Sequence, residues 1–307
     1  MDKIYGLTFA PFAKRGTLDA DDAFISLRTM AERTGCNTVL LAPAAVQETA
    51  QSVNIDYKSE YTLSDDEISK TVAYAKDLGL KVFLKPTVNC MNGTWRAHIN
   101  FFDEDVPCEP KWSEWFASYT EFQMHFATLA NRIGVDMFIP GCEMVMTDHR
   151  EAEWRQLIAD LRTVYDGPIS YNCDKYQEHN VKWWDCVDYI SSSGYYPIND
   201  WENQLDRIEK VINKYNKPFF FAETGCMSVN GSSSIPNDWG LPGEYDEDDQ
   251  LNWYESMFDA CKKRPWVGGM ILWSWTGKLY SKEDVRNYRD YDIYLKKAEE
   301  VVRNNFK

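Results

Sequence analysis

Short apolar runs alternate along the chain with longer segments in which apolar residues recur every three or four positions. Short runs of this kind are typical of buried strands, and the longer segments are typical of helices with one face against a sheet. The eight apolar runs span 4–11, 38–45, 81–88, 137–141, 169–172, 189–195, 219–222 and 270–273. Helices are predicted between them, although residues 174–185 offer at most one short helix.

Helix boundaries support this alternation. Ser64 and Glu67 have the spacing of a capping box, and Gly35, Gly79 and Gly134 each follow a helical segment, as terminating glycines do. Eight strand–helix units in 307 residues predict a single-domain (β/α)8 TIM barrel over residues 1–307, a fold of typically ~250 residues. The alternative is a doubly wound open sheet, but the chain has no glycine-rich phosphate-binding turn.

The composition narrows the choice of partners and compartment. The formal net charge of −15 makes binding to nucleic acid or to an anionic membrane unfavourable. No apolar run approaches the ~18 residues of a membrane span, and the first residues lack the basic and apolar regions of a signal peptide. Eight cysteines without regular spacing indicate free thiols in a reducing compartment. A cytoplasmic location is therefore expected.

Two of the predicted strands run directly into a single glutamate. Ile139 to Glu143 and Phe219 to Gly225 both show this arrangement, and the glutamates are Glu143 and Glu223. They follow strands four and seven, whose carboxyl ends face each other across a barrel, where active sites lie. Paired carboxylates suit the cleavage of glycosidic bonds: ~5–5.5 Å between them gives retention, and a wider spacing gives inversion. The sequence leaves both geometries open.

The loops that follow strands are much longer than those that enter them, so function is expected on the long-loop face. Residues 86–111 and 225–248 form two of these loops. Sugars pack their C–H faces on aromatic rings and form hydrogen bonds at their edges, so aromatic residues beside polar ones suit a sugar site. The loops carry Trp95, Arg96, His98, Phe101, Phe102 and Trp239.

A series of short motifs between Tyr5 and Trp275 resembles glycoside hydrolase family 113, a group of (β/α)8 retaining glycosidases that are endo-acting β-1,4-mannanases. The matching motifs are Leu84-Lys85-Pro86, Trp95-Arg96, Gly141-Cys142-Glu143, Trp154-Arg155-Gln156-Leu157-Ile158, Tyr195-Tyr196-Pro197, Ala222-Glu223-Thr224-Gly225 and Trp273-Ser274-Trp275. The resemblance implies that Glu143 is the acid/base, that Glu223 is the nucleophile oriented by Tyr195, and that no cofactor takes part.

The resemblance also implies a set of substrate-binding residues. Trp273 is expected to form the floor beneath the sugar that is attacked. Trp275 is also a candidate, but only one of the two is expected to reach the barrel mouth, and Trp273 is favoured. The remaining candidates are Lys85, Trp95, Arg96, Asn172 and Cys142.

Three departures from the family and clan patterns leave the substrate open. Cys142, a weak hydrogen-bonding group, stands where many relatives place the asparagine that contacts the sugar 2-hydroxyl. Thr87 replaces an expected histidine, and Ala222 replaces a common threonine. The main hypothesis is therefore a retaining enzyme for β-1,4-linked mannan or manno-oligosaccharides. The alternatives are the same chemistry on β-glucan or xylan, and a non-catalytic sugar-binding barrel.

Other features favour structural roles. The four histidines lie in unrelated segments without a metal-binding spacing, so no metal site is predicted. Trp183 and Trp184 suit either a sugar platform or helix packing, and packing is favoured. The oligomeric state and the choice between endo and exo action depend on features that a single sequence does not specify.

Overall fold

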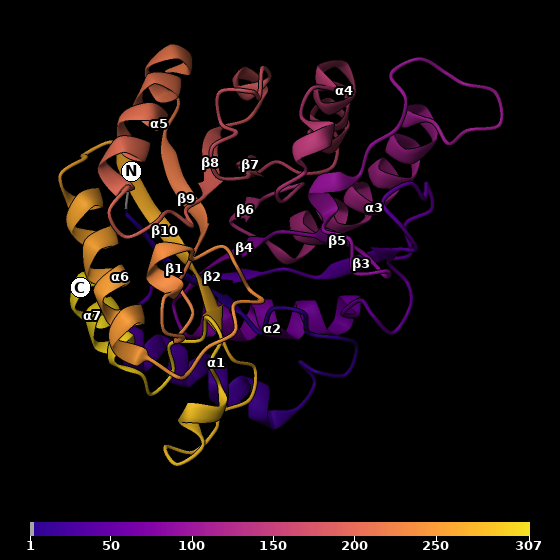
Figure 1. The fold of residues 1–307 in the computed structure, drawn as a ribbon. Coiled ribbons are helices and arrows are strands. Elements are labelled where there is room, and N and C mark those ends of the chain that lie inside the picture. The colour runs from indigo at the N-terminus through magenta and orange to yellow at the C-terminus, as the bar shows by residue number, and fades with distance from the viewer. Residues whose placement is uncertain (1–2) are drawn as a thin grey trace.

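The computed structural model describes residues 3–307 and has a barrel of eight parallel strands inside a layer of helices (Figure 1). This arrangement confirms the predicted (β/α)8 TIM barrel. The strands follow the order β6-β4-β2-β1-β10-β9-β8-β7 around the sheet. Their bounds are β1 Ile4–Phe9, β2 Thr38–Leu41, β4 Lys81–Leu84, β6 Met137–Phe138, β7 Ser170–Cys173, β8 Tyr189–Ser193, β9 Phe219–Thr224 and β10 Val267–Trp275.

The barrel is joined between β6 and β7 by separate bridges rather than by a ladder. Phe138 pairs with Ile169 and Cys142 pairs with Asn172, both in parallel. At the second bridge the Asn172 carbonyl accepts a hydrogen bond from the Glu143 amide at 2.8 Å. We call this junction the seam; it carries the backbone of Glu143.

Two of the predicted strands are each divided in two. Run 38–45 forms β2 and β3 (Ala44–Gln47), and run 81–88 forms β4 and β5 (Thr87–Cys90). The breaks fall at Pro43 and Pro86, which have no amide hydrogen to donate to a ladder. Beyond the breaks, β3 and β5 pair in parallel as a separate two-stranded sheet.

Across residues 3–307, seven α-helices cover the strands, and three of them begin or end at the predicted signals. Ser64 and Glu67 form the capping box of α2, while Gly35 and Gly134 cap the ends of α1 and α3 in the left-handed conformation. In the described residues, β7 and β8 are joined without an α-helix, and only the short 3-10 helix η3 (Trp184–Cys186) lies between them. The helices are α1 Asp21–Thr34, α2 Asp65–Asp77, α3 Trp112–Ile133, α4 Glu151–Leu161, α5 Trp201–Tyr215, α6 Glu247–Lys262 and α7 Lys297–Asn305.

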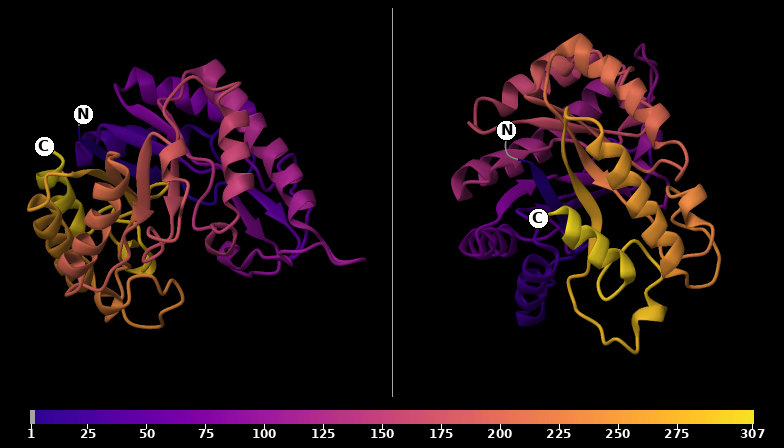
Figure 2. Two further views of the ribbon diagram at one scale, coloured as in Figure 1. Left: turned by 90° about the horizontal axis from the view of Figure 1, so that it is seen from above. Right: turned by 90° about the vertical axis from the view of Figure 1, so that its left-hand side faces the viewer.

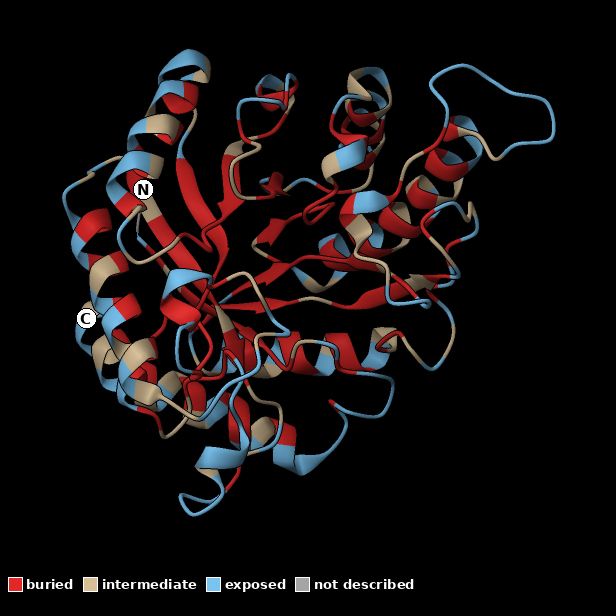
Figure 3. Cartoon of the chain, viewed as in Figure 1, coloured by how far each residue is buried: buried red, intermediate tan, exposed pale blue. Residues whose placement is uncertain are grey.

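The core has two layers. Large buried side chains lie between the strands and the helices. Figure 2 shows the helices around the sheet from two further sides, and Figure 3 shows that their outward faces are exposed. Trp183 and Trp184 belong to this layer, as favoured, and Trp183 stacks on Trp154 at 4.8 Å between ring centroids. A second cluster, which includes Phe83 and Phe220, comes from β1, β2, β4, β6, β9 and β10 and lies in the interior of the barrel. Within residues 3–307, no helix has the length and apolarity needed to cross a bilayer.

Candidate active site

Glu143 and Glu223 are both almost fully buried near the carboxyl ends of their strands. Glu143 lies beyond the end of β6 and is 8% exposed, while Glu223 is 6% exposed. Glu223 is the fifth of six residues in β9, so the prediction that it follows the strand differs from the structure. The ladder to β8 shifts register at this point, where Ser193 pairs with Glu223. A small register shift re-aims the side chains at a strand end.

The carboxyl group of Glu143 has three polar neighbours. Ser193 donates a hydrogen bond to its Oε1 at 2.8 Å, and the indole N–H of Trp95 donates to its Oε2 at 3.3 Å. The Arg96 guanidinium lies 3.6 Å from the same Oε2. Burial raises the pKa of Glu143, the charge of Glu223 raises it further, and Arg96 and Ser193 oppose the rise. Glu143 therefore keeps its proton to a higher pH than an ordinary glutamate does.

The backbone that carries Glu143 has an unusual conformation. Glu143 has a φ of 55°, a left-handed conformation that costs ~1–3 kcal/mol for a residue other than glycine. The bridge from its amide to Asn172 holds it there. Two residues earlier, Gly141 has a φ of 147°, and a Cβ at that position would lie 2.8 Å from the Tyr171 ring. Glycine is therefore required to bring the chain past β7.

Glu223 has the opposite electrostatic environment. Its Oε2 accepts a hydrogen bond from the Lys85 ammonium at 2.7 Å, and its Oε1 accepts one from the Tyr195 hydroxyl at 2.7 Å. Burial alone would raise the pKa of Glu223, but the charge and hydrogen bond of Lys85, with the hydrogen bond from Tyr195, bring it below its ordinary value. Glu223 therefore favours the ionised form.

Three predicted substrate-binding residues lie beneath the two carboxyl groups. Lys85 and Asn172 have no exposed surface and Cys142 is 1% exposed, because all three side chains are enclosed where the strands converge. Lys85 donates to Asn172 at 2.8 Å, and the Cys142 sulfur lies 3.6 Å from both Asn172 Oδ1 and Glu223 Oε2. The expected direct contact with sugar is therefore corrected to a supporting position under Glu223.

Residues two apart in a regular strand share a face. The ladder between β10 and β1 shifts register between Leu272 and Trp275, however, and the two tryptophans lie on opposite faces. Trp273 is partly exposed, and its ring centroid is 5.9 Å from the Lys85 ammonium and 5.5 Å from the Phe12 ring. Trp275 is fully buried and donates to Ser26 of α1 at 3.1 Å. Trp273 thus faces the site, whereas the proposal of Trp275 as a substrate-binding residue is wrong for this structure, because Trp275 packs behind the sheet.

Some aromatic residues of the predicted mouth are exposed there, and others are buried. Trp95 makes an edge contact with Trp239, which is 67% exposed, at 6.2 Å between ring centroids. Phe102 is also exposed, but Phe101 is buried against Trp112 and does not face the mouth. The sequence interpretation missed Phe12, a 61% exposed ring beside Trp273.

Further neighbours of Glu143 were also missed. Ser193 is the last of three consecutive serines in β8. A run of serines in a buried strand is a sequence signal that could have indicated polar groups near the site. Asp174 and Lys175 come directly after β7, the strand-end position that identified the two glutamates. The same rule applied to β7 would have selected them.

A carboxyl group with a raised pKa beside one with a lowered pKa can perform acid and nucleophile chemistry at a single centre. The neutral acid can protonate a leaving oxygen while the carboxylate attacks carbon, which is the division of roles in glycoside hydrolysis. Tyr195 and Lys85 fix the two oxygens of Glu223, so attack requires little reorganisation.

Comparisons with known proteins agree with this chemistry. The model of Glycoside Hydrolase Family 113 matches residues 7–296. A solved structure described as a GH113 β-1,4-mannanase is 50% identical with a TM-score of 0.98, covering 100% of this chain and 99% of that chain. The GH113 β-mannanase from Alicyclobacillus acidocaldarius, solved in complex with ManMIm, is 43% identical with a TM-score of 0.96, covering 100% and 97%.

More distant structures share the fold alone. A β-glucuronidase from Dictyoglomus thermophilum is 16% identical with a TM-score of 0.68, covering 99% of this chain and 50% of that one. No curated protein sequence matched the chain. The family match, the similar structures and the two carboxyl groups lead to one conclusion: the chain belongs to glycoside hydrolase family 113 and is a glycoside hydrolase.

Proposed function

We propose that the protein is a retaining β-1,4-mannanase in which Glu143 is the acid/base and Glu223 is the nucleophile. The observation that carries the proposal is the contrast between the two carboxyl groups, since Lys85 and Tyr195 lower the pKa of Glu223 while burial and Glu223 raise that of Glu143. The mannan substrate is supported by the printed descriptions of the two family members above, each a β-mannanase.

In the first step, Glu143 gives its proton to the glycosidic oxygen while Glu223 attacks the anomeric carbon. The bond to the leaving sugar breaks and a glycosyl ester forms on Glu223. Esterification removes the charge of Glu223, one of the causes that raise the pKa of Glu143. Glu143 then takes a proton from water as that water attacks the anomeric carbon, which restores both carboxyl groups and retains the configuration.

The test is product analysis of mannohexaose, cellohexaose and xylohexaose with the unmutated protein, Glu143→Ala and Glu223→Ala. Glu109→Ala, in the exposed loop before α3, is the control. Chromatography identifies the products, and NMR of the new anomeric signal reports the configuration. Mannohexaose cleavage with retention, lost in both active-site variants and kept in the control, would support the proposal. Inverted product, or full activity in Glu223→Ala, would overturn the mechanism.

The same experiment separates the alternatives. Cleavage of cellohexaose or xylohexaose in preference to mannohexaose would identify β-glucan or xylan as the substrate. Cys142 leaves this outcome open, because it stands where many relatives have the asparagine that contacts the sugar 2-hydroxyl. Calorimetric binding without turnover would indicate a sugar-binding barrel, against which the supporting contacts of Lys85 and Tyr195 to Glu223 argue. The cytoplasmic location remains a prediction, to be checked by fractionation of the native cells.

A further inference from the structure

Asp174 and Lys175 form an ion pair directly beyond the end of β7, beside the residues that contact Glu143. The Lys175 ammonium lies 3.5 Å from Asp174 Oδ1, and the two side chains are 13% and 7% exposed. The same ammonium lies 5.7 Å from the centroid of the Trp95 ring. Trp95 in turn donates its indole N–H to Glu143. A continuous series of contacts therefore links Asp174 to the carboxyl group of Glu143.

The backbone provides a second link. The Asn172 carbonyl accepts the Glu143 amide across the seam, and Asp174 is only two residues farther along the chain. The turn that follows is closed by a hydrogen bond from the Gln177 amide to the Asp174 carbonyl at 3.2 Å. The pair and Glu143 are thus placed by the same strand end.

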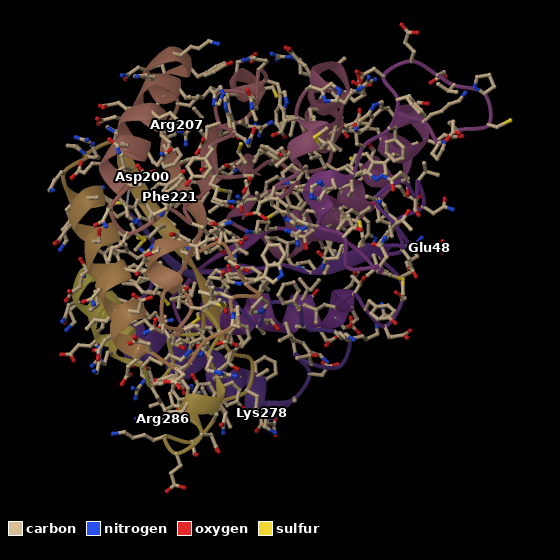
Figure 4. The ribbon with its side chains drawn as sticks, in the orientation of Figure 1. Glu48, Asp200, Arg207, Phe221, Lys278 and Arg286 are labelled. Atoms are coloured by element: carbon tan, nitrogen blue, oxygen red, sulfur yellow. The ribbon has the colours of Figure 1, made fainter. Side chains whose placement is uncertain are left out.

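The pKa of Asp174 depends on the charged groups around the Asp174–Lys175 pair. Burial first, and the charge of Glu143 second, raise the pKa of Asp174 to about 7, while Lys175 lowers the pKa of both carboxyl groups. Glu178 also raises the pKa of Asp174, but Glu178 has its own ion pair with Arg207, which projects from α5 (Figure 4).

Other titratable groups face the same region. Asp148 is buried beside Tyr171, which donates to it, and the charge of Asp174 contributes to the raised pKa of Asp148. Glu223 and Arg96 also act on Glu143: the charge of Glu223 raises its pKa, and the charge of Arg96 lowers it. Since Lys175 interacts with both Asp174 and Glu143, it is the cation that links the two carboxyl groups.

We propose that Asp174 and Lys175 are positioning residues for the acid: Lys175 holds the Trp95 ring against Glu143, and Asp174 neutralises Lys175 so that Glu143 keeps its proton. This inference rests on the proposed function, because it requires Glu143 to act as the acid. Without Asp174, the uncompensated ammonium of Lys175 would favour the ionised form of Glu143. Activity would then be lost at a lower pH.

The charge of the pair predicts the direction of each substitution. The native pair is neutral overall when Asp174 is ionised. Asp174→Asn leaves a net positive charge, so the basic limb of the pH profile of kcat/KM should move down by about one pH unit. Lys175→Met leaves a negative charge, or none if Asp174 takes up a proton, so the limb should not move down. The double variant is neutral again, and its limb should return to the native position.

The experiment compares kcat/KM for mannohexaose across the pH range in the native protein, the three variants and a matched control. The control is Asp292→Asn: Asp292 is also buried and burial raises its pKa to about 7, but its charged neighbours are Lys296 and Asp290. The basic limb should stay in place in this control. Lys175→Arg, which keeps the charge, should also keep the native limb.

Two results would overturn the inference. One is an unmoved basic limb in a folded Asp174→Asn variant, and the other is a double variant whose limb stays displaced. A simple loss of structure would lower the rate in both single variants without the return in the double variant. Failure of the proposed function would give a different result, because Glu143→Ala would then still cleave mannohexaose and its pH profile would still have a basic limb. If Glu143→Ala is inactive but Asp174→Asn keeps the native limb, only the present inference fails.

Discussion

Replacing Lys85 by methionine tests the electrostatic basis of the site. Methionine is similar in length but removes the charge and the donors, and Lys85 has no exposed surface. The substitution removes the 2.7 Å contact to Glu223, the 2.8 Å contact to Asn172 and the 3.4 Å contact to the Ala222 carbonyl. Glu223 would keep its hydrogen bond from Tyr195 but lose the neighbouring cation.

The expected magnitude follows from these contacts. An adjacent opposite charge shifts a carboxyl pKa by ~1–3 units, so the pKa of Glu223 should rise by about that amount. Glu223 must be ionised to attack, and the acid limb of kcat/KM should therefore move up. For a rise of two units, measured one unit above the native acid limb, the ionised fraction falls about tenfold, and the rate falls with it.

The ionisation of Glu223 should also make the free energy of unfolding depend on pH. In the native protein the pKa of Glu223 is lowered, so its contribution to stability is present above the unfolded pKa and is lost as the pH falls. In Lys85→Met the pKa is raised, and the ionised Glu223 is buried without its cation. Leaving a buried charge unpaired costs ~3–5 kcal/mol, and proton uptake limits this cost. The loss of stability should therefore be largest at high pH and shrink as the pH falls.

The assay combines the pH profile of kcat/KM on mannohexaose with urea unfolding at two pH values. Lys296→Met is the matched control, because Lys296 is also a fully buried lysine but its nearest carboxylate is Asp290, at 3.6 Å. It should lose stability without moving the acid limb. An acid limb that stays in its native place in folded Lys85→Met would refute the reasoning, since Glu223 would then be ionised without Lys85.

Further predictions concern packing and thiol chemistry. Gly141→Ala should unfold at lower temperature and lose most activity, because the new Cβ would lie 2.8 Å from the Tyr171 ring; a melting curve with an activity assay checks both. Trp275→Phe should lose about 1–3 kcal/mol of stability, since it leaves Ser26 without the indole donor, yet KM should stay unchanged. In the folded protein, Cys108 should react first with a thiol reagent, as it is exposed, and activity should persist; loss of activity on this first labelling would contradict the burial described.

The strands and their order were predictable because each is a short apolar run between turn residues. The division at Pro43 and Pro86 was missed, because 38–45 and 81–88 were each taken as one strand although proline cannot donate to a ladder. The missing helix between β7 and β8 was indicated by the weak apolar period of residues 174–185. The apolar runs and the weak helical period depend on local sequence, which is why they could be recognised without a structure.

The site was predictable only in part. Glu143 and Glu223 could be chosen because strand ends meet in a barrel, whereas the enclosure of Lys85 depends on strands far apart in the sequence. A regular strand would place Trp273 and Trp275 on the same face, so their opposite placement depends on the register shift in β10 and on the packing of Trp275 against α1. The exposure of a side chain depends on the tertiary structure. For this reason Lys85, Asn172 and Cys142, which lie enclosed beneath Glu223, were expected from the sequence to contact the sugar.

The seam between β6 and β7 gives the barrel an uneven resistance to denaturation. Every other neighbouring pair of barrel strands shares a ladder, whereas this pair shares single bridges, one of which carries the amide of Glu143. Segments with fewer backbone hydrogen bonds open at lower free energy than the rest of a fold. Mild heat or urea should therefore separate Glu143 from Glu223 and inactivate the enzyme before circular dichroism records any loss of helix. The working lifetime of the catalyst would then be set at this junction, and a strengthened seam would extend it more than a better-packed core.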